Sequence, residues 1–491
     1  MKGRAHPDRY PQREFPFIPR IINPIKIRDV ILFSADEAIR KSQRIIQADM
    51  PWVNVQVHSN PLTVSAIHSD GAGVLILDDV AMNLVDIEKI RRNNNDVVIA
   101  LLSFVRLIQC SPPQIARREF PYTGDADLVF AANRGEFAPD KIITAVVRSA
   151  EDHLNIEKRS EVRRFILLIV DDEPNWPSQF LPILYKIIGQ RADVKITRTY
   201  EEALKFMFGV EDETEISEDY RDFGYGDQVV CLITDILFPQ GDKITADAGR
   251  SLIGLVNRFY IRIPIIIASQ AKDLPALADK GFVLAKGDPG SLETLGSYIR
   301  DRTGIGDFVI YDESGEEVHR AKDVRGMYAL LSKADGKSPE ADRLRSLLEI
   351  YGERDKFSTW LYMHGFRALG DTLRPQKLKG ERMIAVLRRS LRSAMLKMQY
   401  TPLVVDGIKV FNLQDLRTVL QSVPAEQLEH LSHNDIISSW LDQKGYSELA
   451  DALRPIHGTG SELRAAIRGA VEEWMNTYGE RSRSSSGSGE L

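Results

Sequence analysis

The chain has 491 residues, 43% of them hydrophobic and 27% charged, which is an ordinary composition for a soluble globular protein of about three to four domains. No stretch approaches the ~20 apolar residues of a membrane span, and no apolar core follows the basic N-terminus, so neither a span nor a secretory signal is expected. The net charge of −6 excludes a general attraction to nucleic acid. Cys110 and Cys231 lie in or beside apolar runs, which predicts buried thiols in a reducing, cytoplasmic setting.

The N-terminal third is predicted to contain a flexible arm and an α/β unit. Residues 1–27 are rich in proline and arginine and are typical of a loose arm. Residues 28–158 carry short apolar runs that alternate with helix-like segments, as in βαβ units. The apolar runs lie at 30–34, 74–77, 97–102 and 128–131, and the helix-like segments at 35–48, 86–92 and 141–154.

Residues 162–304 form a second α/β unit in which four apolar runs each end in a polar side chain. The runs are followed by Asp171 and Asp172, by Asp235, by Ser269 and by Lys286. Such runs predict parallel strands buried on both faces, and the carboxyl ends of parallel strands meet at one edge of the sheet. The pair Asp171 and Asp172 alone could also be an acidic loop or a helix N-cap.

This ordered set of residues resembles the receiver domain of two-component response regulators. The resemblance implies a flavodoxin-like, doubly wound parallel sheet and a histidine kinase or other phosphodonor as partner. It also implies phosphoryl acceptance at Asp235, with a metal held by Asp171, Asp172, Asp235 and the Leu237 carbonyl. Phosphate would be contacted by Ser269 and Lys286.

The chemistry of these residues agrees with that resemblance. Three clustered carboxylates repel one another and need a hard divalent cation, for which Mg²⁺ is the expected cofactor. Asp235 would attack a phosphoryl group, Lys286 would supply a positive charge, and Ser269 would donate its hydroxyl. No enzymatic activity is expected beyond this self-phosphorylation and a slow loss of the phosphoryl group.

Three departures from the family pattern concern the conformational switch. Gly287 follows Lys286 where the family has proline, and Val283 stands at the aromatic switch position, with Phe282 one place away. The short separation between Ser269 and Lys286 leaves room for only a short helix. The phosphate chemistry is therefore predicted to be better preserved than the usual switch.

The first α/β unit, residues 28–158, follows the same order of elements, which predicts an internal duplication and a pseudo-receiver. In the predicted degenerate site, Ala35 stands in place of Asp171, Ala132 in place of Lys286 and Met82 in place of Pro239, while Asp36, Asp78 and Ser103 are retained. Without the lysine and one carboxylate, phosphorylation of Asp78 is not expected. A docking or homodimer surface is the expected role.

Residues 210–228 are an acidic insertion of the central domain, with eight Asp or Glu against Arg221. A solvated loop is the main interpretation, and a docking site for a basic partner is the alternative.

The C-terminal third contains a repeat. The motif that begins at Trp360 and ends with Arg374 and a proline returns eighty residues later, from Trp440 to Arg454 and a proline, with eight of sixteen positions identical. We expect helical repeats at 305–400 and 401–480, each a short strand or turn followed by amphipathic helices, and a disordered tail at 481–491. The tryptophans are expected in the core. The arginines are expected to form caps and ion pairs, with a grip on a carboxylate or phosphate as the alternative.

The stretch 374–397 carries eight Lys or Arg against Glu381. The main interpretation is the solvated face of an amphipathic helix, and nucleic-acid binding is the alternative, although no clear recognition helix is present.

Segments 155–157, 180–188 and 306–318 extend the resemblance to the tandem-receiver region of phosphoenolpyruvate synthase-like proteins, over residues 28–375. No phosphate loop or catalytic histidine region of a synthase follows. The sequence therefore predicts two receiver-type parallel sheets followed by two mainly helical repeats, and a response regulator that signals through a protein partner of the repeats. A phosphorylation-independent scaffold is the alternative.

Overall fold

In the computed structural model, the chain forms two compact units, 1–298 and 299–491. The described residues are 25–34, 40–41, 43–59, 73–78, 81, 84–93, 97–103, 126–131, 139–158, 164–216, 224–260, 263–270, 280–288, 290–374 and 378–485. None of the helices in this part of the chain has the length and apolar character needed to cross a membrane.

The first unit begins with a five-stranded parallel sheet in the order β2-β1-β3-β4-β5. Its central strands are apolar and buried on both faces, as the sequence predicts. The edge strand β2 was not predicted, because its apolar residues alternate with polar ones. The elements are β1 (Asp29–Phe33), α2 (Gln43–Asp49), β2 (Asn54–His58), β3 (Gly73–Leu77), α5 (Ile87–Asn93), β4 (Val97–Ser103), β5 (Leu128–Ala131) and α7 (Pro139–Lys158).

A second five-stranded parallel sheet follows, in the order β7-β6-β8-β11-β12. Its elements are β6 (Phe165–Val170), α8 (Asn175–Ile188), β7 (Ala192–Thr197), α9 (Tyr200–Phe208), β8 (Val229–Thr234), β9 (Phe238–Gln240), β10 (Lys243–Thr245), α10 (Ala246–Phe259), β11 (Ile265–Ser269), β12 (Phe282–Ala285) and α11 (Ser291–Thr303). Both sheets have the flavodoxin-like order 2-1-3-4-5. The antiparallel hairpin of β9 and β10, directly after the third strand, was not predicted.

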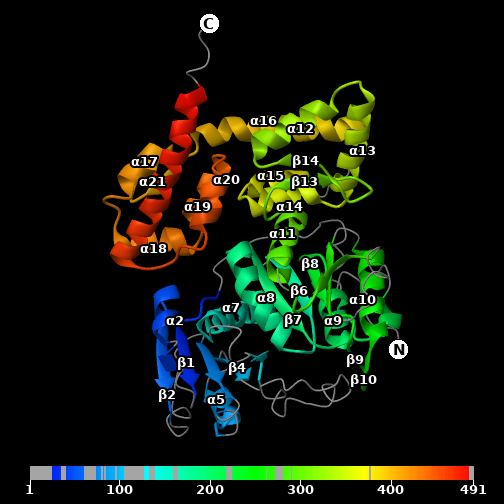
Figure 1. Cartoon of the computed structure of the whole chain (residues 1–491), viewed down its shortest axis with the longest axis vertical. Helices are drawn as coiled ribbons and strands as arrows, with labels where there is room; N and C mark the ends of the chain where they lie inside the picture. The colour runs from blue at the N-terminus through cyan, green and yellow to red at the C-terminus, as the bar shows by residue number, and fades with distance from the viewer. Residues whose placement is uncertain are drawn as a thin grey trace. The chain divides into compact units, whose positions relative to one another are not determined.

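Helix α7 packs against both sheets of the first unit. It contacts β4 of the first sheet and also α8 and β7 beside the second sheet (Figure 1). Ile156 of α7 belongs to the hydrophobic core of the second sheet. The buried carboxylate of Asp152 accepts hydrogen bonds from the Tyr185 hydroxyl of α8 and the Val194 amide of β7, each at 2.9 Å. One helix therefore completes two α/β layers.

The described end of the predicted arm is also attached to α7. Ile27 is fully buried, and its amide donates to Glu151 at 3.0 Å. The Ile25 amide donates to Asn155 at 2.7 Å. The prediction of a flexible arm over 1–27 is thus wrong for residues 25–27, because polar side chains of α7 bind their backbone. Residues 1–24 lie outside the described part.

In the second unit, the same series of elements occurs twice, a two-stranded hairpin followed by five helices. The first series is β13 (Phe308–Tyr311), β14 (Glu317–Ala321), α12 (Val324–Ala334), α13 (Pro339–Glu353), α14 (Lys356–Met363), α15 (Arg367–Leu373) and α16 (Gly380–Tyr400). The second is β15 (Leu403–Val405), β16 (Ile408–Val410), α17 (Leu413–Val419), α18 (Ala425–His433), α19 (Ile436–Gln443), α20 (Ser447–Leu453) and α21 (Gly460–Ser485). Each series has its own hydrophobic core. The predicted fold class, two parallel α/β sheets followed by a mainly helical region, is confirmed.

The repeated motif forms the core of each series. Trp360 and Trp440 are buried, and their indole nitrogens donate to the carbonyls of Gly306 and Thr401. The arginines that end the motif are also buried. Arg374 lies 3.7 Å from the carboxylate of Asp355, and Arg454 donates to that of Asp442 at 2.9 Å. These contacts favour the ion-pair interpretation of the two arginines.

Three other segments compare with their predictions as follows. In the acidic insertion, residues 211–215 are exposed, while Val210 and Ile216 on either side pack against the core. Helix α16 buries its apolar side and exposes Arg382, Arg389 and Arg392, as an amphipathic helix does. Helix α21 runs through Ser485, so the predicted disordered tail is helical over 481–485.

Candidate functional site

The ends of four strands of the second sheet place the predicted site residues. The first residue after each of three strands forms one further backbone hydrogen bond with the neighbouring strand. The Asp171 amide donates to Thr197, the Asp235 amide to Val170 at 2.9 Å, and the Lys286 amide to Ser269 at 3.1 Å. Their backbones are therefore fixed by the sheet, and the side chains share its carboxyl edge.

Lys286 brings two of the predicted carboxylates together. Its fully buried ammonium lies 2.7 Å from Asp171 Oδ2 and is in direct contact with Asp235 Oδ2. The second oxygen of Asp235 accepts from the Ile236 amide at 2.6 Å. The Asp235 side chain keeps 13% of its surface exposed, against 2% for Asp171. Asp235 is thus the carboxylate of this pair that solvent can reach.

The charges at this edge do not balance among the side chains. Although burial alone would lower it, the pKa of Lys286 is raised by Asp171 and Asp235. Burial raises the pKa of Asp171 to about 7, an increase that Lys286 limits and Asp235 reinforces. Burial likewise raises the pKa of Asp172 to about 6, with Glu173 and Asp235 adding to the effect. One ammonium faces more than one acid, so an added cation would relieve the excess negative charge.

The carboxylates at this edge are oxygen donors, the kind of ligand that a magnesium ion takes. Among the described residues, no group of three or more His, Cys, Asp or Glu side chains is gathered closely enough to hold a metal. Magnesium does not require such a group, because it commonly binds through one or two carboxylates together with water and phosphate. Asp171 and Asp235, both in contact with the Lys286 ammonium, are two such carboxylates.

Ser269 is at the expected end of β11. It is buried, and it pairs in register with Ala285, the residue before Lys286. The turn after Lys286 explains a departure from the family pattern. Gly287 has a φ of +84°, which proline cannot adopt, because its ring fixes φ near −65°. The ring of Phe282, one place before Val283, stacks on Tyr298 of α11, with ring centroids 4.3 Å apart.

Two residues of the site were not predicted from the sequence. The ring of Trp176, from the first turn of α8, has its centroid 5.4 Å from the Lys286 ammonium, within range of a cation–π interaction. Its indole nitrogen donates to Glu173 at 2.7 Å, and the Glu173 amide donates to Asp171 at 3.1 Å. No sequence signal identifies Trp176, because a tryptophan early in a helix is usually a core residue.

The register of the first sheet corrects the alignment of the degenerate site. The last paired residues of β1 and β3 are followed by Ser34 and Asp78, whereas those of β6 and β8 are followed by Asp171 and Asp235. Ser34, and not Ala35, therefore occupies the position of Asp171. The prediction was one residue out because Ser34 was counted as part of the strand.

Two local donors bind the carboxylate of Asp78 in the first sheet. The Ser34 hydroxyl donates to Asp78 Oδ2 at 2.5 Å, and the Ala81 amide donates to Asp78 Oδ1 at 2.7 Å. Both oxygens of the buried Asp78 are thus used in holding the local chain. Asp36, Met82 and Ala132 of the predicted degenerate site lie outside the described residues.

Comparisons with known proteins add no support to this geometry. No protein-family model and no curated protein matches the chain. Among solved structures, the crystal structure of NtrX from Brucella abortus in complex with ADP aligns with 91% of this chain and 99% of its own, at 11% identity and a TM-score of 0.18. That TM-score is too low for an argument about fold or function.

Proposed function

We propose that the chain is a response regulator of the two-component type that accepts a phosphoryl group on Asp235 with the aid of Mg²⁺. The observation that carries the proposal is the ammonium of Lys286, which contacts the carboxylates of both Asp171 and Asp235 at the carboxyl edge of the second sheet. A buried lysine between two acids can stabilise the oxygens of an incoming phosphoryl group.

In the proposed reaction, one oxygen of the Asp235 carboxylate attacks the phosphorus of a donor, such as a phosphohistidine of a kinase or acetyl phosphate. The bond from phosphorus to the donor breaks, the donor leaves with the electron pair, and an acyl phosphate remains on Asp235. Bound magnesium would neutralise charge on the transferring oxygens. Lys286 then holds the phosphoryl group, and the Asp235 backbone stays fixed through its bond to Val170. No other enzymatic activity is proposed.

The proposed output is protein–protein interaction through the helical repeats, in the cytoplasm. Two observations favour this over nucleic-acid binding. The apolar side of α16 is buried in the core of the first repeat, so the helix is not free to enter a groove. Two basic residues of the stretch 374–397 also have acidic partners, since Arg388 contacts Asp335 and Lys379 lies 2.6 Å from Glu353. The first sheet, with Asp78 engaged locally, would serve as a docking or dimer surface.

Phosphoryl acceptance is tested with acetyl phosphate in the presence of Mg²⁺. We expect one acid-stable, hydroxylamine-sensitive adduct per chain by intact-protein mass spectrometry. Asp235→Asn should abolish the adduct, because the nucleophilic oxygen is lost. The matched control is Asp78→Asn, the corresponding residue of the first sheet, which should be labelled as well as wild type. Equal labelling of Asp235→Asn, or none of wild type, would refute the proposal.

Magnesium binding separates a phosphoacceptor from a phosphorylation-independent scaffold, the second candidate. For a phosphoacceptor, Asp172→Ala should raise the Kd for Mg²⁺ at least about 10-fold, since even outer-sphere groups contribute 10–100-fold to metal affinity. Isothermal titration calorimetry measures the change. Asp242→Ala, an exposed acid in the β9–β10 turn, is the control and should bind as wild type does. Identical affinities for all three proteins would favour the scaffold.

A further inference from the structure

The two hairpins of the second unit correspond over three residue pairs, which in the first hairpin precede a register shift after Ile310. Val309 lies opposite Arg320 in β13–β14, and Val404 lies opposite Lys409 in β15–β16. Directly opposed residues of an antiparallel pair point to the same face. The adjacent pairs point to the other face and contribute to the two hydrophobic cores. Val309 with Arg320, and Val404 with Lys409, therefore mark the outer faces.

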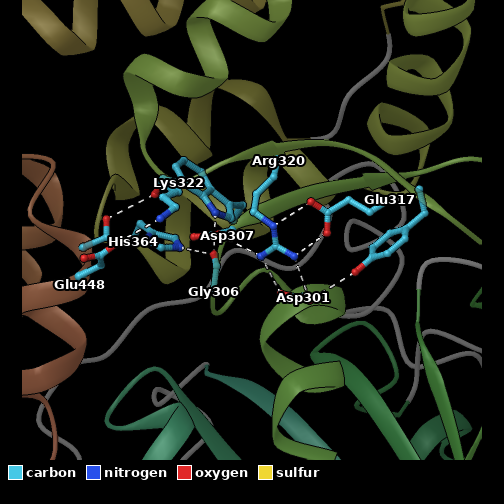
Figure 2. A network of polar contacts seen from close by, with 11 residues as sticks. Asp301, Gly306, Asp307, Glu317, Arg320, Lys322, His364 and Glu448 are labelled. Carbon is cyan, nitrogen blue, oxygen red and sulfur yellow. Dashed lines mark hydrogen bonds and ion pairs between the residues drawn. The ribbon is translucent and has the colours of Figure 1, made fainter. Parts of the chain in front are cut away.

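The outer face of the first hairpin is covered by the last turn of α11, residues 299–303. Val309 is only 3% exposed. The guanidinium of Arg320 binds both oxygens of Asp301 at 3.2 Å, and Figure 2 shows it surrounded by Asp301, Asp307 and Glu317. The guanidinium of Arg302 lies 3.2 Å from the ring centroid of Tyr311. The cover is thus a helix end that presents a carboxylate to the basic residue of the hairpin.

The outer face of the second hairpin has no such cover among the described residues. Val404 is 53% exposed, although the corresponding Val309 is buried. Phe411, the residue after β16, is 43% exposed. Lys409 is exposed, and it has no hydrogen bond or ion pair to any residue in the described ranges. An apolar strip with one unpaired cation remains where the first repeat has a buried contact.

The preceding helix of the second repeat cannot supply the cover. Helix α16 buries Met383, Ile384, Leu387 and Leu391 in the core of the first repeat. It ends at Tyr400, so only two residues connect it to β15. In the first repeat, four residues connect α11 to β13, which lets the end of α11 turn back over the hairpin.

We infer that the outer face of the β15–β16 hairpin, formed by Val404, Lys409 and Phe411, binds an α-helix of a partner protein whose last turn carries a carboxylate. This inference deepens the proposed function, because it assigns the partner site of the repeats. The first repeat supplies the template for the contact, with Asp301 against Arg320. A second copy of the chain is not the expected occupant, because the last turn of each copy's α11 already covers its own first hairpin.

The probe is a stapled helical peptide with the sequence of residues 291–304, labelled with fluorescein and added to the full-length protein. We expect saturable binding by fluorescence anisotropy, lost at least tenfold in affinity on Lys409→Glu or Val404→Glu. A peptide with Asp301→Lys should bind wild type at least tenfold more weakly and should regain affinity for Lys409→Glu. Leu84→Glu, at an exposed leucine of the first unit, is the control variant and should bind as wild type does.

Two results would overturn the inference. One is peptide binding that is absent, or unchanged by Lys409→Glu and Val404→Glu. The other is a wild-type dimer in sedimentation that Val404→Glu dissociates, since a second copy would then occupy the face. The measurement is repeated with Asp235→Asn, which keeps the hairpin intact. Peptide binding to Asp235→Asn would show that the partner site does not depend on phosphorylation of Asp235. Labelling of Asp235 without peptide binding would support the proposed function and refute the partner site.

Discussion

A fragment of residues 160–304, which holds every strand of the second sheet, should fail to fold cooperatively. It lacks α7, and with it Ile156 of the core and the carboxylate of Asp152 that binds α8 and β7. Exposing the apolar side chains that α7 covers costs about 1.5–3 kcal/mol each. Two or three such losses approach the ~5–15 kcal/mol by which a whole domain is usually stable. Circular dichroism during thermal unfolding measures the effect.

Fragments 139–304 and 25–304 are the matched controls for this prediction. The first restores α7 alone, and the second restores the complete described part of the first unit. We expect a cooperative transition in both, with the higher Tm for 25–304, where the other side of α7 is covered by β4 and residues 25–27. A fragment 160–304 that melts at the same temperature as 139–304 would show that α7 is dispensable for the second sheet.

The role of α7 illustrates where the sequence is a poor guide. Its positions 148, 151, 152 and 155 are polar, and a polar stripe on a helix normally indicates a face in solvent. Here those side chains are buried because each has a partner outside the helix, as Arg148 does in the Gly189 carbonyl at 3.3 Å. Strand β7 was not predicted from the sequence, for a similar reason. Its Asp193 pairs with buried Arg164 at 2.9 Å, which a reading of hydrophobicity cannot anticipate.

The candidate site was more predictable, because it depends on strand ends. A run buried on both faces must stop where the first charged residue appears, so Asp171, Asp235 and Lys286 could be placed at one edge. The details required the hydrogen-bond register. The correct counterpart of Asp171 is Ser34, one residue before Ala35. The sequence does not show whether a serine at the end of an apolar run is the last residue of the strand or the first residue after it. The contact of one ammonium with two acids could not be derived from spacing.

Replacing Asp442 by asparagine should lower the free energy of unfolding of the second unit by about 3–5 kcal/mol, the usual cost of removing one partner from a buried ion pair. Its carboxylate lies 2.7 Å from His364 Nδ1 of the first repeat and accepts from Arg454 and Ser447 of the second. His364 Nε2 lies 2.9 Å from the Gly306 carbonyl, in the network drawn in Figure 2. Asparagine would leave the buried guanidinium of Arg454 without its buried counter-charge. The loss is measured by urea unfolding of the full-length chain, monitored by tryptophan fluorescence.

The pH dependence of the same variant gives an independent check. Although burial alone would raise it, His364 and Arg454 hold the pKa of Asp442 well below its ordinary value of 3.8. A carboxylate with a depressed pKa stabilises the fold at neutral pH, and this contribution is lost as the pH falls below about 4. Wild type should therefore lose stability relative to Asp442→Asn on acidification, and the two curves should converge. Asp451→Asn, whose side chain is 53% exposed beside Arg454, should stay within about 0.5 kcal/mol of wild type at every pH. A difference between wild type and Asp442→Asn that is small at neutral pH, or constant down to acid pH, would contradict a buried ionic link between the repeats.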